Sequence, residues 1–206
     1  LTDYDKAFKT LDANILTYNK RRNIPGVSKQ FSQQETHVIA MHWGHAAGRE
    51  RLLNTLGLTS EEVLAILNTL TTKDIDFVNS MHRIMGSLRP EAEAMISRKG
   101  EPQPAWAVAM PTKLAAGNLT GGYAHIGYLN EYDTPAEDYK NLEKAGHTAM
   151  MVGDAYRNKP VASVIGKDLD LSIDSQLWAL NQVARDIAYN EYATEMRLLL
   201  NNKEVV

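Results

Sequence analysis

Apolar residues recur every three or four positions along most of this chain, a spacing that predicts a series of amphipathic helices. The first predicted helix runs to about Lys20 and ends before the breaker Pro25-Gly26. The second begins at a capping box formed by Ser32 and Glu35, and we expect it to continue to about Leu56.

Two further capping boxes, Thr59 with Glu62 and Thr71 with Asp74, predict the starts of a third and a fourth helix. Pro90 is expected to kink or restart the fourth. The residues expected on the buried faces of these two helices are Val63, Leu64, Ile66, Leu67, Leu70, Ile75, Val78, Met81, Ile84, Met85 and Leu88.

The pattern changes from Gly100 onward, because prolines and glycines interrupt any helical spacing. Two short strands are predicted here, Trp106–Met110 and Tyr123–Leu129, with a glycine-rich turn over 117–122 before the second. A short helix near Ala136–Lys144 is expected in the polar stretch that follows.

The last segment has the longest helical stripe in the chain. Its expected buried face comprises Ile173, Leu177, Leu180, Val183, Ala184, Ile187, Ala188, Tyr192, Met196 and Leu199.

The predicted fold is mainly α: a helical bundle with a long C-terminal helix and a small irregular or β-hairpin insertion in the middle. Its parts are a helical region over 1–100, the irregular segment over 101–166, and the C-terminal helix over 167–206, which packs on the first region. Because the first residue is Leu1, we expect one domain of a longer chain, a fragment or processed product.

Composition supports a folded chain and excludes some functions. With 44% hydrophobic and 23% charged residues among 206, it is typical of globular proteins. A net charge of -3 gives no broad attraction to phosphate backbones, so no specific nucleic acid is predicted as a partner. The absence of cysteine excludes disulfides and cysteine zinc sites, and no apolar run approaches the ~20 residues of a membrane span.

Two histidines are the candidate metal ligands. On one straight helix, His42 and His45 share a face, whereas His37 lies about 140° from His42 around the axis. A third ligand would have to come from another helix, as a carboxylate or His82. The alternative is that these histidines are polar or interfacial residues without a metal. No cofactor and no catalytic set is predicted.

Small residues Ala40, Gly44 and Gly48 follow one another at a spacing of four. Each glycine costs a helix about 1 kcal/mol, so something must offset that loss. Close approach of another helix is the simplest explanation, and a gap that admits a ligand is the alternative. The other glycine-rich stretch, 117–122, lacks the Lys and Ser or Thr of a phosphate-binding loop and is interpreted as a turn.

Several short motifs, taken in order, resemble a segment of the very large internal virion proteins of tailed bacteriophages and prophages. The similarity covers roughly Gln34 to Val206. Its motifs are Gly44-His45-Ala46-Ala47-Gly48-Arg49-Glu50-Arg51-Leu52-Leu53, Thr72-Lys73-Asp74-Ile75-Asp76-Phe77-Val78, Ser87-Leu88-Arg89-Pro90-Glu91, Gly121-Gly122-Tyr123, Gly146-His147-Thr148 and Ala184-Arg185-Asp186-Ile187-Ala188-Tyr189.

The resemblance implies a context and no catalytic residues. Such proteins are packed inside the capsid and enter the host with the genome, so the implied location is the virion interior and then the host envelope or cytoplasm. The expected function is a noncatalytic structural or interaction module of an ejection protein; the alternative is a helical metal-dependent enzyme using His42 and His45. Expected partners are other virion proteins or the remaining domains of the same polypeptide, and an oligomer is possible. The chain departs from the family where an asparagine-rich stretch is usual, at 44–48, and where Ala124 and His125 follow Gly-Gly-Tyr.

Overall fold

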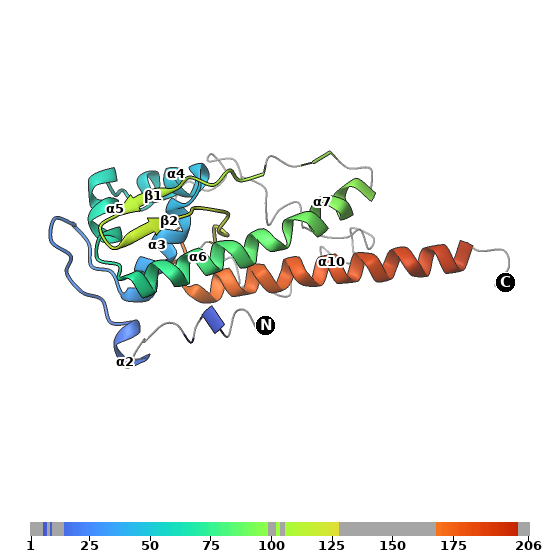
Figure 1. The fold of residues 1–206 in the computed structure, drawn as a ribbon, viewed down its shortest axis with the longest axis horizontal. Coiled ribbons are helices and arrows are strands. Elements are labelled where there is room, and N and C mark those ends of the chain that lie inside the picture. Colours follow the sequence, from blue (N-terminus) through green and yellow to red (C-terminus); the bar gives the residue numbers. More distant parts are fainter. Residues whose placement is uncertain are drawn as a thin grey trace.

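The computed structural model describes residues 6–7, 9, 15–98, 102–103, 106–127 and 168–201, and within them the chain is mainly helical. The elements are α2 (Ile15–Tyr18), α3 (Gln33–Trp43), α4 (Ala46–Asn54), α5 (Ser60–Leu67), α6 (Thr72–Ser87), α7 (Arg89–Arg98), β1 (Thr112–Leu114), β2 (Gly117–Leu119) and α10 (Ile173–Asn201) (Figure 1). The predicted fold class, with its long C-terminal helix and a hairpin in the middle, is confirmed. The helix expected near Ala136–Lys144 lies outside the described residues.

The three predicted capping boxes are present. Ser32, Thr59 and Thr71 each accept a hydrogen bond from a backbone N–H of the following turn, and the acidic side chain there bonds back to the cap. These local bonds fix the starts of α3, α5 and α6, because they satisfy N–H groups that have no partner inside the helix. Pro90 stands at the beginning of α7, so the expected restart after α6 also occurs.

One predicted helix is in fact two. The expectation of a continuous helix from Ser32 to about Leu56 is wrong, because the chain turns at Gly44 and His45 between α3 and α4. His45 is extended, with φ −152° and ψ 160°, and it forms a bridge with Ala109. The Gly44 carbonyl accepts from the N–H groups of Met110 and Gly122, at 2.8 and 3.0 Å. A segment far along the chain therefore supplies bonds that a continuous helix would supply internally.

The hairpin lies between the two predicted strands. The stretches 106–110 and 123–127 contain no strand in the described residues, and the antiparallel pair is β1 with β2, with Thr112 opposite Leu119 and Leu114 opposite Gly117. The predicted turn over 117–122 is partly correct, since Gly121 and Gly122 have φ of 70° and 153°. Leu114 and Leu119 point into the core, which explains why so short a hairpin is stable here.

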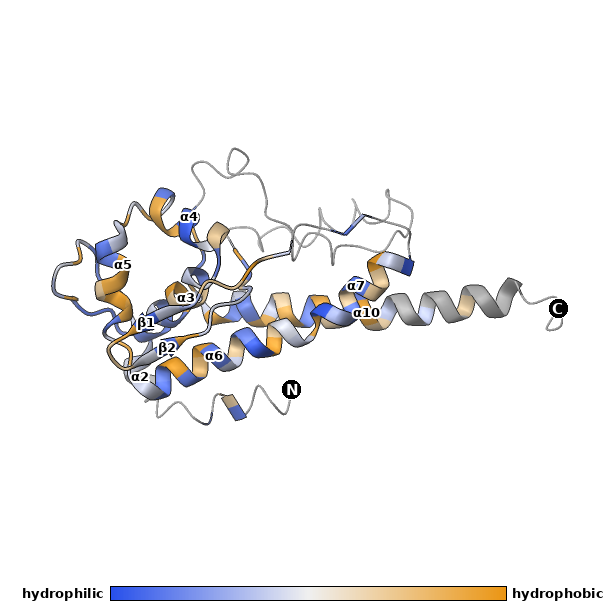
Figure 2. Ribbon diagram, turned by 45° about the horizontal axis from the view of Figure 1, so that its top comes forward, coloured by the Kyte–Doolittle hydropathy of each residue, from blue (hydrophilic) through white to orange (hydrophobic). Residues whose placement is uncertain are grey.

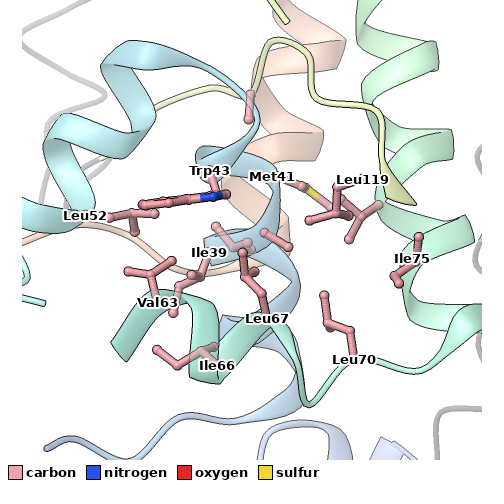
Figure 3. Close-up of a cluster of buried hydrophobic side chains, with 14 of the residues drawn as sticks. Ile39, Met41, Trp43, Leu52, Val63, Ile66, Leu67, Leu70, Ile75 and Leu119 are labelled. Carbon is pink, nitrogen blue, oxygen red and sulfur yellow. The ribbon is translucent and has the colours of Figure 1, made fainter. Parts of the chain in front are cut away.

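The main hydrophobic core lies where α3, α5, α6 and the hairpin meet (Figure 3). Ile39, Val63, Ile66 and Leu67 are fully buried, and Trp43 covers one side of the cluster. Figure 2 shows apolar and polar stretches alternating along α5 and α6, as expected of amphipathic helices. The predicted faces differ from the structure at a few positions: Leu64 is exposed, and Ile84 and Leu88 are half-buried. Phe77, which was not predicted, is fully buried.

Helix α10 contributes to two hydrophobic clusters. Near its start, Ile173 belongs to the main core, and further along, Val183 and Ile187 pack against α7 in a second cluster with Ala92, Met95 and Ile96. The far end of α10 continues past α7 (Figure 1). Predicted burial is wrong for Tyr192, Met196, Ala184 and Ala188, which are exposed, while Leu177 and Leu180 are half-buried. No helix among the described residues is long and apolar enough to cross a membrane.

Substitution of Ile187 by alanine should lower the free energy of unfolding by about 2 to 4 kcal/mol, because it deletes buried methyl groups from the second cluster. Ile187 is 8% exposed, whereas Leu180 is half-buried, so Leu180→Ala on the same helix is the matched control and should cost clearly less. Urea denaturation of both variants measures the difference. Equal losses would show that the α7–α10 contact adds little to stability.

Candidate functional site

Four elements or segments of the described chain bring histidines into the interior: α3, the residue before α4, α6, and the segment after the hairpin. Helix α3 carries two of them on different faces. The capping box at Ser32 fixes the start of α3. His37 and His42 lie five residues apart on this helix, and both are 0% exposed. His37 faces α2 and α6, whereas His42 faces the segment that follows the hairpin. The angular separation expected from the sequence therefore sends the two imidazoles into separate environments.

His37 forms a buried relay with Tyr18 and Asp74. The His37 Nε2 lies 2.7 Å from the Asp74 Oδ1, and its Nδ1 lies 2.9 Å from the Tyr18 hydroxyl. Since a carboxylate only accepts, Nε2 donates, and in the neutral ring Nδ1 accepts from Tyr18. Burial, followed by the charge of Asp74, raises the pKa of Tyr18 above its usual range. That hydroxyl is therefore not activated as a nucleophile, and the relay connects α2, α3 and α6.

Asp74 is the shared residue of this relay and of the α6 cap. Its Oδ1 accepts from His37 and Gln33, while its Oδ2 accepts from the backbone N–H and hydroxyl of Thr71. Burial alone would raise the pKa of Asp74, but the hydrogen bonds from His37, Thr71 and Gln33 outweigh it and hold the pKa well below its usual value. The carboxylate therefore stays charged in neutral and mildly acidic solution.

The other four interior histidines form one cluster, which we call the histidine cluster: His42, His45, His82 and His125. His42 donates from Nε2 to the His125 carbonyl at 2.9 Å. His82, on α6, donates from Nε2 to the Met41 carbonyl at 3.1 Å. His45 caps α4, its Nδ1 accepting from the Gly48 N–H at 3.3 Å. Each of these three imidazoles thus uses one ring nitrogen to satisfy a backbone group.

The glycines of α3 and α4 make room for this cluster. A Cβ on Gly44 would lie 2.7 Å from the His82 Cε1, so the imidazole rests directly on the glycine backbone. A Cβ on Gly48 would lie 1.9 Å from the His42 carbonyl oxygen. The predicted close approach of another helix is therefore confirmed at Gly44, where His82 of α6 lies against the backbone. At Gly48 the neighbouring atoms belong to the end of α3, which was predicted as part of the same helix. At both positions these atoms fill the space where a gap for a ligand was the alternative.

Burial keeps the clustered imidazoles neutral. It lowers the pKa of His42 to about 3, with a further contribution from the charge of His45. It lowers the pKa of His45 to about 4, with a contribution from His82, and the pKa of His82 to about 4 against a hydrogen bond to the Met41 carbonyl. Each of these shifts has desolvation as its largest cause, since transfer of a charged ring into the interior is costly.

The structure brings His82 to the two histidines predicted as metal ligands, as the sequence argument required, and adds His125. His42 and His45 do not share a helix face, because α3 ends between them. No group of three His, Cys, Asp or Glu side chains in the described ranges is arranged to hold a metal ion. Metal binding by His42 and His45 stays a prediction, and elemental analysis of the purified protein, with His45→Ala as comparison, is its measurement.

His125 was missed by sequence reasoning. It lies far from the other histidines along the chain, and the signal that could have located it is the turn at Gly121 and Gly122, which directs the chain back across α3 and α6. A Cβ on Gly122 would lie 2.9 Å from the His82 Cβ, so this turn approaches α6 as closely as Gly44 does. The backbone of His125 then reaches both His42 and α10.

A surface cleft of about 470 Å³ opens beside His82. Its lining residues are polar or small: Asp76, Asn79, Ser80, His82, Arg83, Thr120 and Gly121. Asn79 is already engaged, donating to the Asn118 carbonyl and accepting from the Thr120 N–H, each at 2.9 Å. One acidic and one basic side chain line the cleft, so its charge does not favour either an anion or a cation.

Comparison of the chain with models of protein families, with curated proteins and with solved structures finds no match. The resemblance to internal virion proteins is thus supported by the short sequence motifs alone.

Proposed function

We propose that this chain is a noncatalytic, mainly helical module of an internal virion protein that is ejected with phage DNA. The order of the short motifs supports the virion context. The chemistry of the interior supports a structural role, because His37, His42, His45 and His82 each use a ring nitrogen for a structural hydrogen bond. These bonds are the relay with Tyr18 and Asp74, two bonds to backbone carbonyls and the α4 cap.

The observation that carries the interaction role is an exposed apolar stripe on α10. Trp178, Tyr189, Tyr192 and Met196 are 46%, 73%, 58% and 39% exposed, and we call them the α10 stripe. At about 100° per residue, these positions fall within roughly 60° of the helix circumference. Large exposed side chains aligned on one face are typical of protein interaction surfaces.

The far half of α10 extends this surface away from the two cores (Figure 1). Burial after Ile187 is described for Ala188, Tyr189, Tyr192 and Met196, and all four are exposed. Short isolated helices are only marginally stable in water, so a partner surface that covers these exposed side chains would stabilise this half of α10. The partners proposed are other virion proteins or the remaining domains of the same polypeptide.

The proposal is tested in particles that carry the parent protein. Replacing Tyr189 and Tyr192 together by serine should reduce the parent protein per particle several-fold, as measured by quantitative mass spectrometry against the major capsid protein. Ala184→Ser, on an exposed position about 120° around the helix from Trp178, is the control and should change nothing. Full incorporation of the tyrosine variant would count against the interaction role.

Catalysis is examined separately on the purified chain. Assays with glycans, nucleotides and peptides should show no turnover that a single substitution in the histidine cluster abolishes. Such turnover would replace this proposal with the metal-dependent or another enzymatic function.

A further inference from the structure

The surface cleft beside His82 lies between α6 and the end of the hairpin, and we call it the α6 cleft (Figure 1). The Asn79 side chain joins its two sides, because it bonds the Asn118 carbonyl and the Thr120 N–H at 2.9 Å each. His82 is 5% exposed and Gly121 is buried, so these two residues close the inner end of the cleft. The volume of about 470 Å³ lies within the range of roughly 300 to 1,000 Å³ that is usual for small-molecule sites.

Two charged side chains of opposite sign line the α6 cleft from the same helix. Asp76 and Arg83 lie seven residues apart on α6, and at about 100° per residue they share one face. The Arg83 Nη2 donates to the Ser80 Oγ at 2.8 Å, so the guanidinium reaches back along the helix toward Asp76. Its place near Ser80 puts it about one turn, or roughly 6 Å along the axis, from the position of Asp76.

These two charges are available to a ligand. Among the described residues, none forms a hydrogen bond or an ion pair with the Asp76 carboxylate. The described bond of Arg83 goes to a neutral hydroxyl, and a guanidinium has five N–H donors, so most of its donors remain. The Ser80 hydroxyl accepts from Arg83 and keeps its own hydrogen for donation. The cleft therefore offers acceptors at one end, donors at the other and a hydroxyl beside the donors.

The lining of the α6 cleft argues against several classes of ligand. None of its described side chains is aliphatic, and none is Phe, Tyr or Trp, so the cleft has no surface for an apolar tail or for stacking on a sugar or a base. A simple anion would lie near Asp76, and a simple cation would lie near Arg83, so each would meet a like charge. The class that fits is a small polar molecule with a positive charge at one end and a negative charge at the other.

We propose that the α6 cleft binds a dipeptide zwitterion, with its ammonium group at Asp76 and its carboxylate at Arg83. An extended chain spans at most about 3.3 to 3.6 Å per residue, so the end groups of a dipeptide lie roughly 6 to 7 Å apart. This length matches the separation along α6, whereas a single amino acid is too short to reach both side chains. Arginine is suited to the carboxylate end because its planar guanidinium can donate two parallel hydrogen bonds.

The inference is independent of the proposed interaction role. The α6 cleft and the α10 stripe are formed by different elements, so binding of a dipeptide and docking of α10 can succeed or fail separately. Because Asp76 and Arg83 are exposed, solvent and salt screen their charges. The expected affinity is therefore in the millimolar range.

The first experiment titrates the purified chain with L-alanyl-L-alanine at neutral pH and low ionic strength and follows the backbone amide signals by NMR. Saturable shifts are expected over α6 and residues 118–121. N-acetylated dialanine lacks the ammonium group, and dialanine amide lacks the carboxylate, so each should bind about five- to tenfold more weakly. A single alanine should also bind more weakly. Absence of saturable binding by dialanine, or equal binding of all four compounds, would overturn the proposal.

Two variants assign the ends of the ligand. Asp76→Asn should remove the preference for dialanine over its N-acetylated form and keep the preference over the amide. Arg83→Gln should do the reverse, losing only the preference over the amide. Both side chains are exposed, so the variants should fold as the unmodified chain does, which circular dichroism and urea denaturation verify. If both variants keep both preferences, the dipeptide binds elsewhere and the assignment is wrong.

Lys113→Gln on β1 and Glu61→Gln on α5 are the matched controls. Each removes one exposed charge of the same sign as a cleft residue but lies outside the cleft lining. Both controls should keep the affinity for dialanine and both preferences. Losses as large as those of the cleft variants would indicate non-specific association with surface charge and would refute the site.

Discussion

Replacement of Gly48 by alanine should lower the free energy of unfolding by about 3 kcal/mol or more. The added Cβ would lie 1.9 Å from the His42 carbonyl oxygen, 2.7 Å from its carbonyl carbon and 2.9 Å from its Cα. All three atoms belong to the backbone, so no side-chain rotation relieves the contact, and α4 must move away from the end of α3. That movement also breaks the His45 cap on the Gly48 N–H.

Gly86→Ala is the matched control for this substitution. Gly86 is also inside a helix, α6, but nothing lies within 4 Å of the position where its Cβ would be placed. Alanine there should stabilise the protein by up to about 1 kcal/mol through helix propensity. Urea denaturation at neutral pH measures both variants. A Gly48→Ala loss below 1 kcal/mol would show that the α3–α4 corner is not fixed as described.

Replacement of Asp74 by alanine should destabilise the chain by about 3 kcal/mol at pH 7. Loss of the α6 cap accounts for about 1 kcal/mol, and the fully buried His37, left without its carboxylate partner, accounts for about 1 to 3 kcal/mol. Asp76→Ala, an exposed position on the same helix, should change stability by less than about 0.5 kcal/mol and is the control.

The Asp74 contribution should depend on pH in a defined direction. Because the folded-state pKa of Asp74 is below its unfolded value, the stabilisation is fully present above the unfolded pKa and is lost as the pH falls toward the folded value. The difference in unfolding free energy between the unmodified chain and Asp74→Ala should therefore narrow below about pH 4. A difference that stays constant through this range would contradict the assignment of a charged, hydrogen-bonded carboxylate.

The helix starts could be predicted from the sequence because their signals are local. Each capping box joins residues three positions apart, so the starts of α3, α5 and α6 depend little on the rest of the fold. The break between α3 and α4 could not be predicted this way. It is stabilised by Met110 and Gly122, more than sixty residues away, and local helix propensity contains no information about those bonds.

The candidate site was predictable to a smaller extent. The residue types were identified, since His42, His45 and His82 all belong to the cluster, and so was the need for a second helix. The arrangement was not, because the assumed straight helix placed His42 and His45 on a common face. The strand positions failed for a related reason: 106–110 and 123–129 have suitable side chains, but tertiary bonds to the α3–α4 corner replace ladder pairing around Gly44.

Helix α10 is shared by the two hydrophobic clusters. Ile173 packs in the main core, and Val183 and Ile187 pack against α7 in the second cluster. Each cluster therefore depends on side chains from this one helix. Loss of packing in one cluster would weaken the packing of α10 in the other, so we expect the two clusters to unfold as one cooperative unit. A force applied to the C-terminal end of α10 would accordingly act on both hydrophobic clusters.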